Sequence, residues 1–115
     1  MDQDARQDRI LKALGHAQRR EILDLLKIRS RTTGELCDHF KKQLDRCTVM
    51  QHLQVLEKAD LIIVKRTGRY RWNLLNPLPI KELHDRWIGR MADSAVDLLA
   101  RMKRDMEEQI GLKQL

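Results

Sequence analysis

The stretch RCTVMQHLQVLEK, at residues 46–58, most strongly constrains how this chain folds. Its apolar residues Val49, Leu53 and Leu56 follow the i, i+4, i+7 spacing with which a short helix packs on a core. The opposite face presents about one side chain per turn and little negative charge: Cys47, Met50, Gln51, Gln54 and Lys58. The stretch therefore predicts an amphipathic helix whose outward face is available to a partner.

Three shorter helices are expected before this one, at residues 4–14, 17–28, and 34 to about 40 or 42. Gly15 predicts an end to the first helix in the left-handed conformation. Thr33 is expected to cap the third helix, and Asp45 to cap the helix at 46–58 by accepting a hydrogen bond from its free amides. The last two helices, joined by a polar turn, form a helix-turn-helix pattern.

A β-hairpin is expected immediately after the helix-turn-helix. Residues 61–65 form a β-branched run, RTGR reads as a turn, and apolar side chains alternate with polar ones over residues 70–74. A helix-turn-helix followed by a basic hairpin is the pattern of a winged helix, in which the wing contacts phosphates or a minor groove. The predicted fold is mostly α, with a two-stranded wing.

The distribution of charge points to a polyanionic partner. The formal net charge is +6, and residues 46–75 alone carry six Lys or Arg against two Asp or Glu. We find no paired carboxylates, no nucleophile with an adjacent base and no phosphate-binding glycine loop, so an enzyme or a cofactor is not expected. Without a signal peptide or a run of eighteen apolar residues, we expect a cytoplasmic protein that does not enter a membrane, with two free thiols.

The end of the chain is expected to hold a long helix, from about residue 79 to 111, after the prolines of NPLP. Its apolar stripe extends over about thirty residues, or roughly 45 Å, which is longer than a compact domain of this size. We therefore expect residues 1–115 to form one domain that dimerises through this helix and the helix at 4–14. The expected interface residues are Leu11, Leu14, Leu83, Trp87, Met91, Leu98, Leu99 and Met102.

Together these motifs resemble the ArsR/SmtB family of bacterial winged-helix repressors. The resemblance covers residues 11–76 and rests on four stretches: ALGHAQRREILDLL, TTGELCDHF, CTVMQHLQVLEKADLI and VKRTGRYRWNL. It implies a homodimer that binds an imperfect palindrome in double-stranded DNA, often in its own promoter. The chain departs from the family where His16 and Ala17 replace an acidic residue and proline, and where Cys47 and Met50 replace small hydroxyl residues.

The resemblance implies base contacts early in the helix at 46–58, by Cys47, Thr48, Met50 and Gln51. Gln51 suits adenine, and Thr48 or Met50 suits a thymine methyl group. Contacts with phosphates or a minor groove are expected from Arg46, His52, Lys65, Arg66, Arg69 and Arg71. The alternative is an ordinary solvated basic face, and a winged helix can also serve as a protein-interaction or dimerisation module without a specific DNA target.

A sensor role for the two cysteines is a further alternative. ELCDH resembles the family's ELC-x-C arsenic motif, but it supplies only Cys37 and His39, and a closed zinc site needs about four ligands. Cys37 also fits a small core position. Cys47, at a helix N-terminus beside Arg46, is suited to thiol reactivity. We expect no complete metal site, and a metal- or thiol-responsive repressor using Cys37, His39 and Cys47 stays an alternative.

Overall fold

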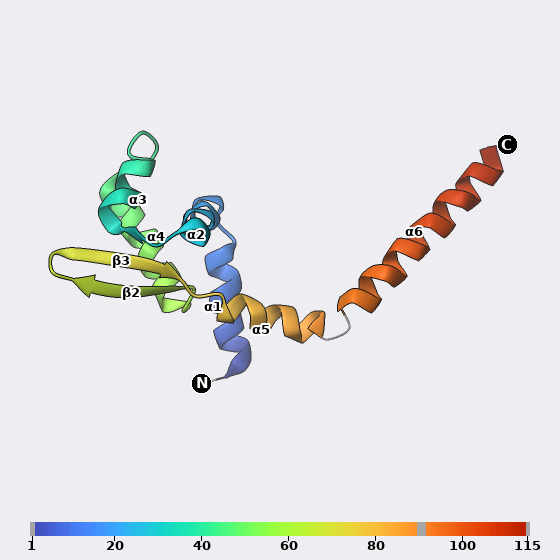
Figure 1. Ribbon diagram of the computed structural model, residues 1–115, viewed down its shortest axis with the longest axis horizontal. Helices are drawn as coiled ribbons and strands as arrows, with labels where there is room; N and C mark the ends of the chain where they lie inside the picture. Colours follow the sequence, from blue (N-terminus) through green and yellow to red (C-terminus); the bar gives the residue numbers. More distant parts are fainter. Residues whose placement is uncertain (1, 90–91, 115) are drawn as a thin grey trace. The chain divides into compact units, whose positions relative to one another are not determined.

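The computed structural model describes residues 2–89 and 92–114 and confirms a mostly helical fold with a small sheet (Figure 1). Its elements in order are α1 (Gln3–Leu14), α2 (Ala17–Ile28), β1 (Arg31–Thr32), α3 (Thr33–Phe40), α4 (Arg46–Lys58), β2 (Ile62–Thr67), β3 (Tyr70–Leu75), α5 (Leu78–Trp87) and α6 (Ala92–Gln114). The chain divides into two compact units, residues 1–81 and 82–115. The first unit contains the helix-turn-helix and the wing.

The helix ends differ from expectation at two positions. Thr32, rather than Thr33, caps α3, because its hydroxyl accepts a hydrogen bond from the Glu35 backbone N–H (3.2 Å). Gly15 has a φ of −74°, so the predicted left-handed end of α1 is wrong. The carbonyl oxygens at that end accept instead from two guanidinium groups, those of Arg19 and Arg20, which lie in the first turn of α2.

The sheet has three antiparallel strands in the order β1-β3-β2, one more than the expected hairpin. The additional strand, β1, pairs Arg31 with Asn73 and Thr32 with Trp72. The hairpin itself is confirmed, with Thr67 opposite Tyr70 at its tip and Gly68 at a φ of +60° in the turn. Strand β1 joins the start of α3 to the base of the wing.

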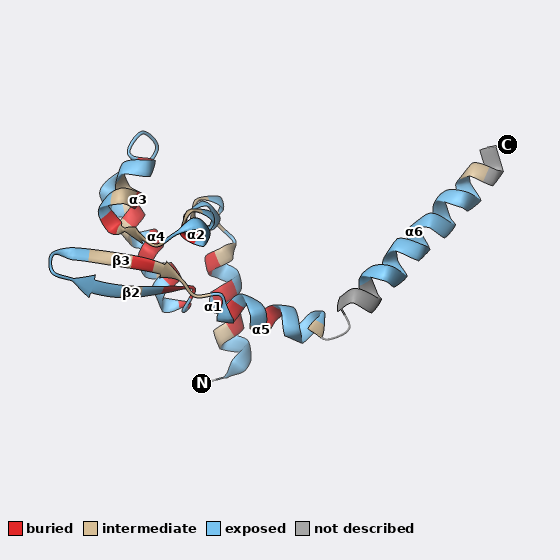
Figure 2. Ribbon diagram, in the orientation of Figure 1, coloured by how far each residue is buried: buried red, intermediate tan, exposed pale blue. Residues whose placement is uncertain are grey.

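The core of the first unit lies where α1, α2, α3 and α4 meet the sheet (Figure 2). The expected apolar stripe of α4 is confirmed, since Val49, Leu53 and Leu56 are fully buried. The other fully or almost fully buried apolar side chains are Ile10, Ala13, Ile22, Leu36, Phe40, Leu61 and Pro79. This packing turns the opposite face of α4 outward.

The expected continuous helix at 79–111 is interrupted. Helix α5 ends at Trp87, and Gly89 has a φ of +56°, a conformation through which an α-helix does not continue. Helix α6 then carries a series of exposed apolar side chains: Val96, Leu98, Leu99, Met102, Met106 and Ile110. Of the helices that the structure describes, none has the length and apolar character of a membrane span.

Candidate nucleic-acid interface

Helix α4 presents the residues that were expected to contact bases. Asp45 caps the helix as expected, accepting from the Thr48 backbone N–H at 2.7 Å. Hydrogen bonds from the Thr48 backbone and side chain hold the pKa of the Asp45 carboxyl below its usual range. On the outward face Cys47 and Gln51 are exposed, while Thr48 and Met50 are half-buried. All four lie in the first two turns of α4.

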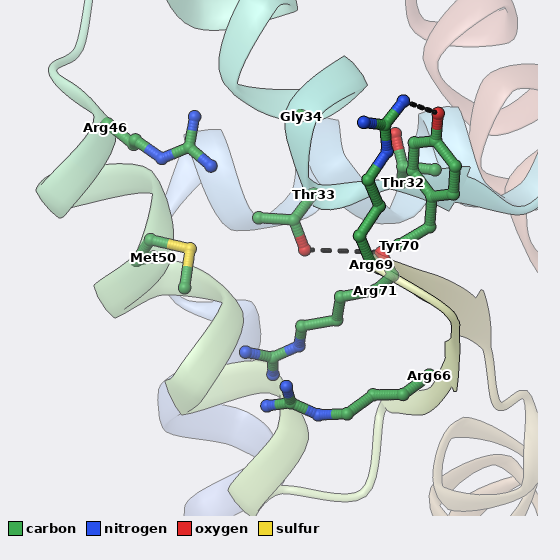
Figure 3. A pocket seen from close by; sticks show the side chains of 9 residues that line it. All are labelled: Thr32, Thr33, Gly34, Arg46, Met50, Arg66, Arg69, Tyr70 and Arg71. Atoms are coloured by element: carbon green, nitrogen blue, oxygen red, sulfur yellow. Dashed lines mark hydrogen bonds between the residues drawn. The ribbon is translucent and has the colours of Figure 1, made fainter.

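A groove runs between α4 and the wing (Figure 3). Its walls come from β1, α3, α4 and the hairpin, and its lining residues are Thr32, Thr33, Gly34, Arg46, Met50, Arg66, Arg69, Tyr70 and Arg71. Figure 3 shows Arg66 and Arg71 extending from the wing toward α4, which carries Arg46 and Met50. Four of the nine lining residues are arginines and none is acidic, so the groove suits an anionic ligand such as a phosphodiester chain.

The wing arginines differ in how they are held. Arg71 is half-buried and its Nη2 lies 2.7 Å from Oε2 of Glu57, near the end of α4. Arg69 lies at the tip, where its Nη2 donates to the Tyr70 hydroxyl (3.1 Å) and its guanidinium lies 5.2 Å from the centre of the Tyr70 ring. Lys65 and Arg66 are exposed. The tip therefore carries accessible cations, whereas Arg71 is held against α4.

A second groove on the outward face of α4 includes two residues that sequence reasoning did not assign to the site. It is lined by Met50, Gln51, Gln54, Glu57 and Arg71. Gln54 follows Gln51 by one helical turn, a spacing that was visible in the sequence. The role of Glu57 was not visible, because only the fold brings it to Arg71.

His52 is buried, so the structure gives no support to its expected contact with a phosphate. The exposed fraction of His52 is only 7%. The ring packs toward α2, where Nδ1 lies 3.3 Å from Nη1 of Arg19 and the ring centroid lies 4.5 Å from that of His16. Burial, together with the nearby charges of His16 and Arg19, lowers the pKa of His52. His52 is therefore part of the packing between α4 and the start of α2.

The candidate sensor residues do not come together as a site in the described part of the chain. Cys37 is half-buried, and burial raises the pKa of its thiol, with Arg46 opposing and Asp38 adding to the shift. His39 lies two residues further along α3, and i, i+2 side chains do not face each other on a helix. Its Nε2 is 3.7 Å from Oε1 of Glu21. Within residues 2–89 and 92–114, no three His, Cys, Asp or Glu side chains gather as potential metal ligands.

Most residues expected at a dimer interface have substantial exposure in the single chain. Exposed fractions of 46–64% are found at Leu11, Trp87, Leu98, Leu99 and Met102, and Leu14 is half-buried. Leu83 is only 7% exposed within the chain itself, so its expected role at an interface is not supported. Met91 lies outside the described residues.

The chain is similar to known transcriptional regulators. A family model described as a helix-turn-helix domain matches residues 14–65. The HTH-type transcriptional regulator YuzN of Bacillus subtilis (strain 168) is 40% identical over 86 residues, covering 70% of this chain and 94% of YuzN. The transcriptional repressor SdpR of the same strain is 32% identical over 73 residues, covering 64% of this chain and 79% of SdpR.

The fold is also that of a solved ArsR-like transcriptional regulator from Rhodococcus sp. RHA1. The two chains are 21% identical with a TM-score of 0.66, and the match covers 90% of this chain and 93% of that one. The fold, the basic groove beside α4 and the YuzN match agree with the motifs that span residues 11–76. The chain belongs to the ArsR/SmtB family of winged helix-turn-helix transcriptional regulators.

Proposed function

We propose that the chain is a homodimeric transcriptional repressor that binds an imperfect palindrome in double-stranded DNA. The observation that carries this proposal is the groove between α4 and the wing, lined by Arg46, Arg66, Arg69 and Arg71. Helix α4 enters the major groove, and the wing follows the adjoining phosphates. The arginines of α4 and the wing supply most of the affinity for the DNA backbone.

Sequence preference comes from the outward face of α4. Gln51 offers an amide that can pair in two places with adenine, and Thr48 and Met50 offer apolar groups to a thymine methyl. Cys47 is exposed in the first turn of α4, and in this proposal it also contacts the major groove of the DNA. Lys65 and Arg66 contact phosphates, and Arg69 at the wing tip enters a minor groove.

The proposed dimer buries the apolar faces that the single chain exposes. Leu98, Leu99 and Met102 are each more than half exposed on α6, and Leu11 is exposed on α1. Apolar side chains repeated along a helix are costly to leave in water and are typical of a subunit interface. A two-fold axis would set two α4 helices about one DNA turn apart, ~34 Å, which requires a palindromic site.

Selection of bound duplexes from a random pool tests the DNA site, followed by titration of the selected site and of random duplex over a range of salt concentrations. Arg69→Ala should weaken binding to all sequences alike and reduce the salt dependence by about one counterion. Gln51→Ala should reduce the preference for the selected site by about 1–3 kcal/mol. Weak and equal affinity for selected and random duplexes would refute the repressor and favour a protein-interaction module.

Analytical ultracentrifugation tests the dimer. Leu99→Glu places a charge in the apolar stripe of α6 and should shift the protein from dimer to monomer. Arg101→Gln, two residues away and therefore on a different face of α6, is the matched control and should leave the dimer intact. A monomeric wild-type protein at micromolar concentration would contradict this part of the proposal while leaving DNA binding to be judged by titration.

A further inference from the structure

Two histidines and an arginine form a cluster beneath α4. Arg19 Nη1 lies 3.3 Å from Nδ1 of His52, and the His52 ring centroid lies 4.5 Å from that of His16. The same guanidinium closes the end of α1, donating to the carbonyl oxygens of Ala13 (2.8 Å) and Lys12 (3.1 Å). The cluster therefore joins α1, α2 and α4 at the place where α4, the helix proposed to contact DNA bases, packs against the other two helices.

The hydrogen bonds require both imidazoles to accept at Nδ1. His16 caps α2, with its Nδ1 3.2 Å from the Gln18 backbone N–H, which can only donate. A guanidinium also can only donate, so Nδ1 of His52 accepts from Arg19 and its single ring proton is on Nε2. A second proton on either ring would remove one of these hydrogen bonds. It would also place two cations side by side.

Among the described residues, the groups that influence the pKa of His52 include no carboxylate. Burial is the largest influence on the pKa of His52, and the charges of His16 and Arg19 on α2 lower it further. On α1, Lys12 takes part through its backbone carbonyl oxygen, which accepts from Arg19. Four carboxylates on neighbouring helices interact with other residues: Glu21 lies beside His39, Glu35 pairs with Arg29, Asp38 influences Cys37, and Glu57 pairs with Arg71. Strand β2 carries only basic charged residues, Lys65 and Arg66, in its exposed half.

We infer that the His16–Arg19–His52 cluster is a pH-sensitive contact that holds α4 against α1 and α2. The contact is stable while both rings are neutral, and it is weakened when His52 gains a proton. The direction of the pH effect follows from the coupling between proton binding and folding. Because the fold holds His52 neutral below its unfolded value of 6.5, the folded chain binds fewer protons than the unfolded chain as the pH falls from 6.5. The stabilisation is complete above pH 6.5 and is lost progressively below it, by up to about tenfold in the folding constant per pH unit.

Titration of the wild-type full chain by NMR tests the first step. The His52 ring should titrate at lower pH in the folded chain than in the same chain unfolded in urea, which serves as the reference. Urea unfolding at several pH values between 5.5 and 7.5 should give a folding constant that falls toward acid. If His52 titrates in the folded chain as it does in the unfolded chain, or if the folding constant is flat over this range, the inference is overturned.

The variant His16→Asp tests the cause. Aspartate is a good N-cap and would keep the bond to Gln18, but its charge would stabilise a proton on His52. The His52 titration should shift upward, and the acid loss of the folding constant should become smaller than in the wild type. His16→Asn keeps a neutral cap and provides a second variant if the first does not fold; it should leave His52 titrating low.

The matched control is His39→Gln, which removes an exposed histidine outside the cluster. Its folding constant should decrease toward low pH as much as that of the wild type. An unchanged pH dependence in His16→Asp, or an equal change in His39→Gln, would overturn the assignment to this cluster. These measurements need neither DNA nor a dimer, so their failure is distinguishable from failure of the proposed function.

Discussion

Arg71 and Glu57 form an ion pair across the junction of the wing and α4, with Nη2 and Oε2 separated by 2.7 Å. The pair lies where the two grooves meet, because Arg71 lines both of them and Glu57 lines the second. Among the described residues that line either groove, Glu57 is the only carboxylate. It therefore offsets one cation on the surface proposed to meet DNA, and opposes binding that relies on phosphates alone.

Replacement of Glu57 by Gln should increase affinity for random duplex DNA. The change removes one negative charge and releases Arg71, so affinity should rise on the order of fivefold, the ratio that corresponds to about 1 kcal/mol. Fluorescence anisotropy at a fixed salt concentration measures the effect. Glu21→Gln, an exposed carboxylate that faces His39 instead of the grooves, is the control. Equal affinities for Glu57→Gln and wild type would show that the ion pair has no such effect.

Asn73 should be required for stability. It is fully buried on β3, and its Nδ2 donates to Thr33 Oγ1 (3.1 Å) and to the Arg31 carbonyl (3.3 Å). Asn73→Ala removes both bonds and leaves their acceptors buried, so urea denaturation should give an unfolding free energy lower by about 1–3 kcal/mol. Gln43→Ala, at an exposed turn residue, should stay within about 0.5 kcal/mol of wild type. A neutral Asn73→Ala would contradict this account.

Asp45 should make α4 sensitive to strong acid. Its pKa is lowered from 3.8 by the hydrogen bonds with Thr48, so the carboxylate stabilises the fold above pH 3.8. This contribution is lost as the pH falls below 3.8 and through the lowered value. Thermal unfolding should show a lower midpoint for Asp45→Ala at pH 7, with a smaller difference from wild type at pH 2.5. Asp45→Asn, which retains a capping oxygen, should recover much of the midpoint at pH 7; no recovery would argue against the cap.

The two cysteines should react at different rates. Cys47 is exposed, whereas Cys37 is half-buried and burial raises the pKa of its thiol, which reduces the reactive thiolate. Iodoacetamide at pH 7.5 followed by peptide mass spectrometry should find Cys47 modified several-fold faster. In urea the difference should disappear. Faster modification of Cys37 in the native protein would show that the helix-turn-helix opens more readily than its burial indicates.

The elements that could be predicted from sequence are those with local signals. Helix α4 has an apolar stripe, a capping Asp45 and a terminal Lys58, and its observed bounds match the expected ones. The wing was equally clear, because a β-branched run and an alternating run flank a glycine turn. The outward face of α4 and the basic wing could therefore be predicted, although Glu57 joins the second groove only through the tertiary contact with Arg71.

The parts that were missed depend on contacts distant in sequence. Strand β1 has two residues, too few for a period, and exists only through pairing with Trp72 and Asn73. The break at Gly89 was hidden because the apolar stripe continues on both sides of it. His52 was expected to reach a phosphate because α4 alone does not reveal that His16 and Arg19 cover this edge of the helix.

The tip of the wing has a consequence for how regulators of this kind diverge. Every residue from 65 to 70 is exposed, while the base of the wing is anchored by the buried Asn73. Substitutions at the tip therefore alter the charge and reach offered to DNA with little effect on the core. Selection can retune the overall affinity for DNA through the five tip positions other than Gly68, whose φ of +60° favours glycine, without a compensating change in the scaffold. A library randomised at those five positions should remain mostly folded.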